Sequence, residues 1–313
     1  MSGNEYDDVL GLGKVSPEVL ERSVFSLLPM EAEPTLDGGT ISLDGKAVIA
    51  HSPSIGVPLD ALGFFAFHYA ASNVAARFGR PRHLVTGIYL PLETRERDLR
   101  TISKNLGDEA RRYRVSVVAG QTATYYGLEI PLITTTCIGE PVGKTVRPRS
   151  GDRVFILGSV GGEAVWLERL SSGGGDDDFR DYTPLPYALR MHGIPGVRLM
   201  HDVSEGGVKR ALLEVSSTND CRIDVDSALI EYADGAKPLG QDVLRAPTYG
   251  ALIVVVNPDA SANVQDVCSE LDVPSADAGA VSEGEGLYID DERVEVGRRM
   301  AIDEVYGSFR KER

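Results

Sequence analysis

Apolar residues recur with a helical period in the middle of the C-terminal half of the chain. Val208, Ala211, Leu212 and Val215 fall on one face and predict an amphipathic helix. An apolar segment, 193–200, precedes it and predicts a buried strand. Between them lies His201-Asp202-Val203-Ser204-Glu205-Gly206-Gly207, where Ser204 is the expected N-cap and the glycines allow a tight turn.

The N-terminal half alternates predicted strands and helices. Ser16 followed by Pro17 is typical of a helix start, and the long run of small and apolar residues over 61–78 predicts a buried helix. The other predicted elements are a charged amphipathic helix over 95–112 and strands over 47–50, 84–90, 115–119 and 128–137.

The C-terminal half repeats this mixture. A helix through Trp166 and Leu170 follows the first strand, and the glycine- and aspartate-rich segment 171–178 is expected to be a solvated loop. The remaining predictions are strands over 153–157 and 251–256, a helix over 262–271 and a closing hairpin over 280–289. This order favours an α+β fold of mixed sheets with helices packed on one face over a doubly wound parallel sheet.

Chain length and the position of turn-forming residues predict two domains. The 313 residues suffice for two ordinary cores, and Pro141, Pro148 and Ser150-Gly151-Asp152 mark a boundary. We therefore expect one domain over 1–148 and a second over 149–313.

Charge limits the classes of partner. The net charge of −15 argues against nonspecific binding to nucleic acid, which is itself a polyanion. No apolar run is long enough to span a membrane, and the acidic N-terminus does not resemble a secretion signal, so a cytoplasmic location is expected. Only seven of the 32 basic residues are lysine, against 47 acids, which suggests adaptation to a salty cytoplasm.

Cys137, Cys221 and Cys268 are scattered along the chain, without the spacing of a zinc site or a disulfide framework. This usage fits a reducing compartment.

The segment 201–207 is the first candidate site. A helix start offers unpaired N–H groups and a positive dipole end to a phosphate, so Ser204, Gly206 and Gly207 are candidate phosphate contacts. Asp202 beside them could hold a metal ion that accompanies the phosphate. The alternative is a capped helix after a buried strand, with no ligand.

A second group of polar residues interrupts the apolar segment 61–78. His68 and Ser72 share one helix face, with Asn73 adjacent, and buried polar groups need partners. The alternative for His68 is a satisfied core histidine. Gln121 and Thr122, expected just beyond the strand 115–119, could likewise only cap a turn.

Several blocks, in order, resemble the AIR synthase (PurM-like) superfamily, and within it an archaeal type close to the hydrogenase-maturation protein HypE. Each block is weak alone, but together they cover almost the whole chain. They are Gly13–Leu20, Leu62-Gly63 through Asn73–Ala76 to Arg80-Pro81, Val118–Thr122, His201–Gly207 and Gly279–Gly284.

The resemblance implies a homodimer in which the N-terminal domains form a shared β-barrel, with clefts that hold ATP and Mg²⁺. It implies ATP-dependent phosphorylation of an oxygen on a small-molecule acceptor. His68 and His201 would contact the acceptor or the phosphate, and Asp202 the metal. The expected nucleotide contacts are Asp37, Ser52, Asn73, Gln121, Thr122, Ser204, Gly206 and Gly207. We expect these distant side chains to converge on one pocket, within one chain or across a two-fold partner.

The chain differs from the family pattern mainly at positions where relatives have carboxylates. Ser72-Asn73 replaces Asn-Asp, His51-Ser52-Pro53 replaces Thr-Asp-Pro, and Gln121 stands where relatives have aspartate or histidine. Asp37-Gly38-Gly39-Thr40 only approximates the early glycine-rich loop. Fewer carboxylates weaken the attraction for Mg²⁺.

The tail 299–313 has no cysteine to accept a carbamoyl group, which argues against the hydrogenase-maturation reaction. Three interpretations stay open: an enzyme of this type with an altered metal site, a homologue that binds nucleotide without turnover, and a thiamine-monophosphate-kinase-like phosphotransferase.

Overall fold

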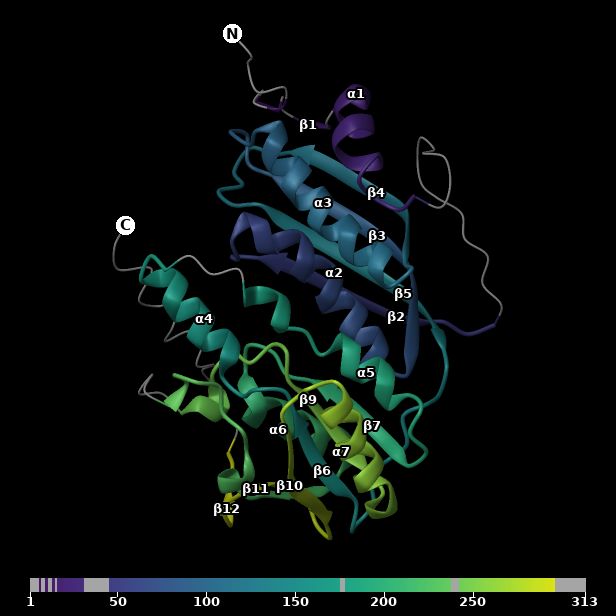
Figure 1. The fold of residues 1–313 in the computed structure, drawn as a ribbon, viewed down its shortest axis with the longest axis vertical. Helices are drawn as coiled ribbons and strands as arrows, with labels where there is room; N and C mark the ends of the chain where they lie inside the picture. Colours follow the sequence, from purple (N-terminus) through teal and green to yellow (C-terminus); the bar gives the residue numbers. More distant parts are fainter. Residues whose placement is uncertain are drawn as a thin grey trace. The chain divides into compact units, whose positions relative to one another are not determined.

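The computed structural model describes residues 6, 9–10, 13–14, 16–30, 45–174, 178–237 and 242–295. The chain divides into two compact units (Figure 1). Unit 1 comprises Met1–Ala75 and Gly79–Val142, and unit 2 comprises Ala76–Phe78 and Gly143–Arg313. Each unit is described by itself.

Unit 1 is built on a mixed five-stranded sheet of order β1-β4-β3-β5-β2. The neighbours β3 and β4 are parallel, and the other pairs are antiparallel. The strands are β1 (Gly13–Lys14), β2 (Val48–Ile55), β3 (Gly79–Leu90), β4 (Ser116–Thr124) and β5 (Leu132–Pro141).

Helices cover one face of this sheet. They are α1 (Pro17–Leu20), which continues as a π-turn over Glu21–Phe25, α2 (Leu59–Ala76) and α3 (Glu96–Arg112). A Cβ on Gly63 would lie 2.2 Å from the Ile102 carbonyl oxygen, so glycine permits the close contact of α2 with α3. Burial alternates along β5, as expected for a sheet with one covered face.

Unit 2 holds a mixed seven-stranded sheet of order β12-β11-β8-β10-β6-β9-β7, in which β8 and β11 are the parallel pair. The strands are β6 (Arg153–Leu157), β7 (Val197–Asp202), β8 (Arg222–Val225), β9 (Leu252–Val256), β10 (Ser275–Ser282), β11 (Gly286–Ile289) and β12 (Glu292–Arg293). The helices are α4 (Gly162–Ser171), α5 (Leu185–Met191), α6 (Gly207–Asn219) and α7 (Ser261–Glu270), with short 3-10 turns at Asp178–Asp181, Ser227–Leu229, Val243–Arg245 and Pro258–Ala260.

Strand β6 of unit 2 is buried on both faces. Val154 and Ile156 belong to the core cluster that includes the apolar face of α6. Phe155 and Leu157, which alternate with them, are equally inaccessible. The expected α+β class with mixed sheets is confirmed. The expectation that helices pack on only one face of the sheet holds for unit 1 and not for unit 2.

Two local expectations are wrong. Residues 280–289 do not form a hairpin, because Ser282 of β10 and Gly286 of β11 both pair with Arg222 of β8, which lies between them. The strand expected over 115–119 extends to Thr124, so Gln121 lies within β4 and not in a turn. No helix among the described residues is long and apolar enough to span a membrane.

Candidate functional site

The segment 201–207 of unit 2 joins a strand end to a helix start. Strand β7 ends at Asp202, and α6 begins at Gly207. The Gly207 N–H donates to the Ser204 carbonyl at 3.0 Å and closes a turn over 204–207. The sequence predicts Ser204 as the N-cap, and this prediction is wrong. Gly206 holds that position, without a side-chain cap. The backbone turn moves the helix start three residues past the serine.

Gly207 is required by its surroundings. Its φ is +64°, a left-handed conformation that glycine adopts without strain. A Cβ there would lie 2.5 Å from the Leu244 carbonyl oxygen and 2.6 Å from that of Ala246. The close approach of segment 244–246 therefore fixes the start of α6.

Asp202 places a carboxylate immediately before this turn. Its side chain is 13% exposed, and its Oδ1 lies 3.8 Å from His201 Nδ1. Burial raises the pKa of Asp202; His201 opposes this rise, and the nearby Glu205 and Glu214 add to it. No cluster of three or more histidine, cysteine or acidic side chains suited to a metal occurs in the described parts of the chain. A cation at Asp202 would need oxygen ligands from another molecule.

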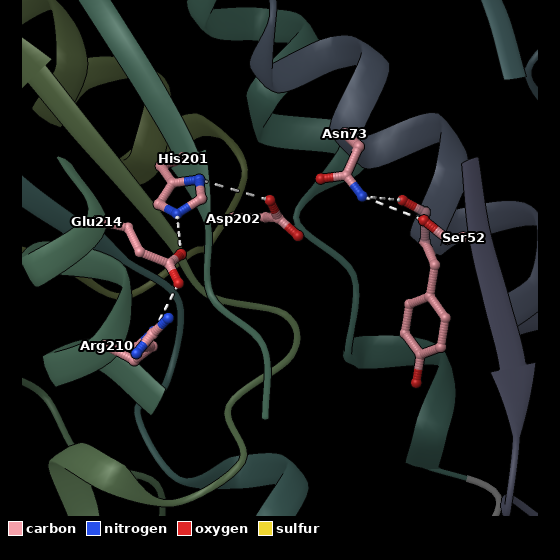
Figure 2. Close-up of polar contacts among 7 residues, drawn as sticks. Ser52, Asn73, His201, Asp202, Arg210 and Glu214 are labelled. Atoms are coloured by element: carbon pink, nitrogen blue, oxygen red, sulfur yellow. Dashed lines mark hydrogen bonds and ion pairs between the residues drawn. The ribbon is translucent and has the colours of Figure 1, made fainter. Parts of the chain in front are cut away.

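His201 is held by α6. Its Nε2 lies 3.0 Å from Glu214 Oε2, while Arg210 Nε donates to Glu214 Oε1 at 2.6 Å (Figure 2). The imidazole is 33% exposed, so it can reach a ligand. Sequence reasoning missed Glu214, because only the packing of α6 against β7 brings it to His201.

In unit 1, Asn73 of α2 and Ser52 of β2 come together. Asn73 Nδ2 donates to Ser52 Oγ at 3.3 Å and to the Tyr69 carbonyl at 3.0 Å. Figure 2 shows the amide nitrogen turned toward Ser52 and the amide oxygen turned away. That oxygen accepts no hydrogen bond from the described residues, so it is available to a ligand.

A row of small and hydroxyl residues crosses the sheet beside Ser52. Register aligns Ser52 with Thr135, Thr135 with Thr86, and Thr86 with Gly120. The Thr135 hydroxyl is fully buried and has no partner in the described structure. Sequence reasoning missed these threonines, because only strand pairing aligns them with Ser52.

Gln121 and Thr122 lie on opposite faces of β4. Thr122 shares the face of the hydroxyl row, whereas Gln121 aligns with Gly87 and Thr134 on the other face. Unit 1 therefore does not bring Gln121 to Asn73, and their convergence stays a prediction about an assembled dimer. Asp37 lies outside the described residues.

His68 lies in the core of unit 1. It is fully buried, with Nε2 3.0 Å from Glu109 Oε2, and its ring centroid lies 4.1 Å from that of Phe64 and 5.7 Å from that of Tyr113. Burial lowers the pKa of His68, and Glu109 partly opposes this. This setting fits a core histidine and gives no support to contact with an acceptor.

Comparisons with known proteins identify the family of the chain. The family model "AIR synthase related protein, C-terminal domain" matches residues 149–292, and the N-terminal domain model matches residues 37–140. The carbamoyl dehydratase HypE of Bradyrhizobium diazoefficiens is 28% identical over 65% of the chain and 63% of its own length. A hydrogenase expression/formation protein of Methanocaldococcus jannaschii is 22% identical over 82% of the chain and 84% of its own length. The chain thus covers somewhat under two thirds of the first of these relatives.

Solved structures show the same fold. HypE of Escherichia coli superposes with a TM-score of 0.81 at 19% identity, over 92% of this chain and 97% of that one. A HypE solved in complex with ATP gives 0.75 at 20% identity, over 92% and 98%. Thiamine-monophosphate kinase from Stenotrophomonas maltophilia gives 0.68 at 20% identity, over 80% and 86%. With both domain models matched along the chain, the protein belongs to the AIR synthase related family.

Proposed function

We propose that this protein is an ATP-dependent enzyme of the AIR synthase type that phosphorylates an oxygen of a small-molecule acceptor, with an altered metal site. One observation carries the proposal: a largely buried acid, Asp202, ends β7 directly before a turn whose Ser204 and Glu205 are exposed at the start of α6. A carboxylate beside open helix N–H groups suits a metal–phosphate pair. A HypE solved with ATP shares the fold, which supports this choice of nucleotide.

The donors fit Mg²⁺ that is held together with nucleotide phosphates. Mg²⁺ commonly uses one or two carboxylates and takes its other ligands from water and substrate phosphates. Asp202 would supply the carboxylate, and water and the nucleotide phosphates the other ligands. When bound, Mg²⁺ neutralises charge on the transferring phosphoryl group. The N–H groups of Ser204, Glu205 and Gly206 would orient the phosphates, since that of Gly207 already donates to the Ser204 carbonyl. His201, held by Glu214, would contact the phosphate or the acceptor.

The thiols of this chain do not suit the role of acceptor. Cys137, Cys221 and Cys268 are all buried and free of disulfides. Burial raises the pKa of each, that of Cys137 to about 12, which disfavours the thiolate. The proposed acceptor is therefore an oxygen of a separate small molecule, and the carbamoyl dehydratase activity that names the relatives is not assigned to this chain.

A second candidate is nucleotide binding without turnover. It is favoured by the single buried carboxylate at the turn and by the absence, in the described residues, of a larger acidic or histidine cluster. The likeness to thiamine-monophosphate kinase is one of fold and does not identify an acceptor.

We also propose that the protein is a homodimer. One face of the unit 1 sheet leaves Ile49 62% and Ile55 48% exposed on β2. These side chains alternate with Ser52 and Ser54, which face α2. Pairing this face with a second copy in a shared β-barrel would bury them. A cytoplasmic and salt-adapted setting remains a prediction from the sequence, and an archaeal origin a prediction from the family resemblance.

The test combines binding with turnover. Thermal unfolding in high KCl is followed with ATP, ADP and Mg²⁺, and ATP hydrolysis is measured with the wild type and Asp202→Asn. Ligand at about one hundred times Kd should stabilise the protein by about 2.7 kcal/mol. The control is Asp224→Asn, whose carboxylate instead pairs with Arg222 on β8.

Each outcome separates the candidates. Hydrolysis that is lost in Asp202→Asn but kept in the control supports the enzyme. Stabilisation by ATP without hydrolysis in any variant favours binding without turnover. No thermal shift at millimolar nucleotide rejects both.

A further inference from the structure

One loop of unit 2 contacts two of its glycine-containing turns. This loop, residues 244–250 and hereafter the bridging loop, leads into β9. The first turn, 158–162, joins β6 to α4, and the second, 204–207, precedes α6. Both turns hold a glycine with positive φ, Gly161 at +84° and Gly207 at +64°.

The bridging loop contacts the turn 204–207 through backbone atoms. The carbonyl oxygens of Leu244 and Ala246 occupy the space that a Cβ on Gly207 would need. The Thr248 N–H donates to the Ser204 carbonyl at 3.4 Å, the same oxygen that accepts from Gly207 N–H. A shift of the loop would therefore move the oxygen that closes the turn.

The other side of the bridging loop is anchored to α4 and its turn. Gly161 N–H donates to Thr248 Oγ1 at 3.1 Å, and Ala164 N–H to the Pro247 carbonyl at 3.2 Å. Tyr249 N–H donates to Glu163 Oε2 at 2.7 Å. Thr248 is fully buried and Glu163 is 7% exposed, so water does not readily replace these bonds.

Burial at this position makes the charged form of the Glu163 carboxylate unfavourable. Burial raises its pKa to about 7, against the opposing hydrogen bond from Tyr249, and the Glu205 carboxylate raises it further. A glutamine could accept the same bond without an ionisable group.

We propose that Glu163 is a positioning residue for the turn 204–207, which it fixes through the bridging loop. Loss of the Tyr249–Glu163 bond removes one of the bonds that anchor the loop to α4 and its turn. The loop then gains freedom to shift, and the Ser204 carbonyl loses the geometry that closes the turn. The consequence for ligand binding rests on the proposed function, because it requires nucleotide phosphates at that turn.

The first measurement needs no nucleotide. Amide hydrogen exchange is followed in Glu163→Ala and Glu163→Gln. In Glu163→Ala, exchange at Tyr249, Thr248 and Gly207 should accelerate by about tenfold or more, while Glu163→Gln should stay within about threefold of the wild type. The matched control is Asp152→Asn, a buried acid of the same unit that accepts the Arg149 N–H at 2.7 Å. It should leave the Gly207 amide unchanged.

A second variant keeps the test informative should Glu163→Ala fail to fold. Thr248→Val removes the acceptor of the Gly161 N–H while preserving side-chain shape, and it should also accelerate exchange at Gly207. Acceleration confined to Tyr249, or equal acceleration at Gly207 in Asp152→Asn, overturns the proposal.

The second measurement is MgATP affinity, which should weaken about tenfold in Glu163→Ala and recover in Glu163→Gln. If exchange at Gly207 responds as expected but no variant, the wild type included, binds MgATP, the positioning role stands and the proposed function fails. If the wild type binds MgATP and Glu163→Ala leaves both affinity and Gly207 exchange unchanged, the positioning role fails and the proposed function stands.

Discussion

His201 Nε2 lies 3.0 Å from Glu214 Oε2, so a residue at the end of β7 is paired with one two turns into α6. Arg210 donates to the other oxygen of the same carboxylate from one turn earlier on the helix. Glu214 thereby links the orientation of the His201 imidazole to the position of α6, and the start of α6 is the proposed phosphate contact.

Glu214→Gln should destabilise unit 2 at neutral pH and not in acid. Partial burial raises the pKa of Glu214, but Arg210 and His201 outweigh it, and the net pKa lies below its usual value. A lowered folded-state pKa gives stability that is present above the unfolded pKa and is lost as pH falls through the folded value. The carboxylate is 43% exposed, so we expect a loss of about 0.5–1 kcal/mol at pH 7.

Urea unfolding at neutral and acidic pH measures this difference. The control is Glu270→Gln, which breaks an exposed ion pair with Arg190 that involves no histidine. A pH-independent effect in Glu214→Gln would contradict the assignment.

Gly207→Ala should be much more destabilising than Gly151→Ala. Both glycines have positive φ, but a Cβ on Gly151 meets nothing within 4 Å, whereas one on Gly207 meets two carbonyl oxygens of the bridging loop. The backbone conformation alone costs about 1–2 kcal/mol, which is the expected loss for Gly151→Ala. The added overlap should bring Gly207→Ala to roughly 3 kcal/mol or more. Urea unfolding measures both losses in unfolding free energy. Equal losses would show that the bridging loop moves to make room for the Cβ at little cost.

The sequence predicts those elements whose signal is local. Strand β6 is predicted at its observed bounds, because an apolar run between turn residues marks a buried strand. The apolar stripe of α6 is likewise correct, and it packs in the core cluster. Its start is misplaced, because the usual preference for a serine cap yields to the close approach of the bridging loop at Gly207.

What depends on strand pairing is not predictable in this way. The strands β10 and β11 are close in sequence, but β8 lies between them, and no turn residue encodes that insertion. Extending β4 by a few residues decides which face receives Gln121, because side chains alternate at every position. Glu214 and Thr135 become candidates only once the helix and the strands are in place.

His68→Gln should reduce the acid sensitivity of unit 1. Burial lowers the pKa of His68 in the folded state, so the unfolded chain binds more protons just below the usual value, and stability falls as pH falls through about 6.5. A glutamine can still donate to Glu109 but cannot take up a proton. We expect a flatter change in unfolding free energy between about pH 7.5 and 5.5. MgATP affinity should stay that of the wild type, since the side chain is fully buried. A lost affinity in a folded variant would instead support ligand contact by His68.

Ile49→Glu should yield a monomer. The substitution places a charge on the exposed face of β2, and a two-fold interface would receive it twice. Light scattering should show a dimer for the wild type and a dissociation constant about a hundredfold or more weaker for the variant. The control is Leu229→Glu, which charges a side chain that is 53% exposed on unit 2.

This variant also tests the role of Gln121, which shares the uncovered sheet face with Ile49. If Gln121 contacts nucleotide only across a dimer, then Ile49→Glu and Gln121→Ala should weaken MgATP binding by similar factors, and the double variant should be no weaker than Ile49→Glu alone. A monomeric wild type would reject the dimer. Additive losses in a dimeric wild type would mean that Gln121 acts within its own chain.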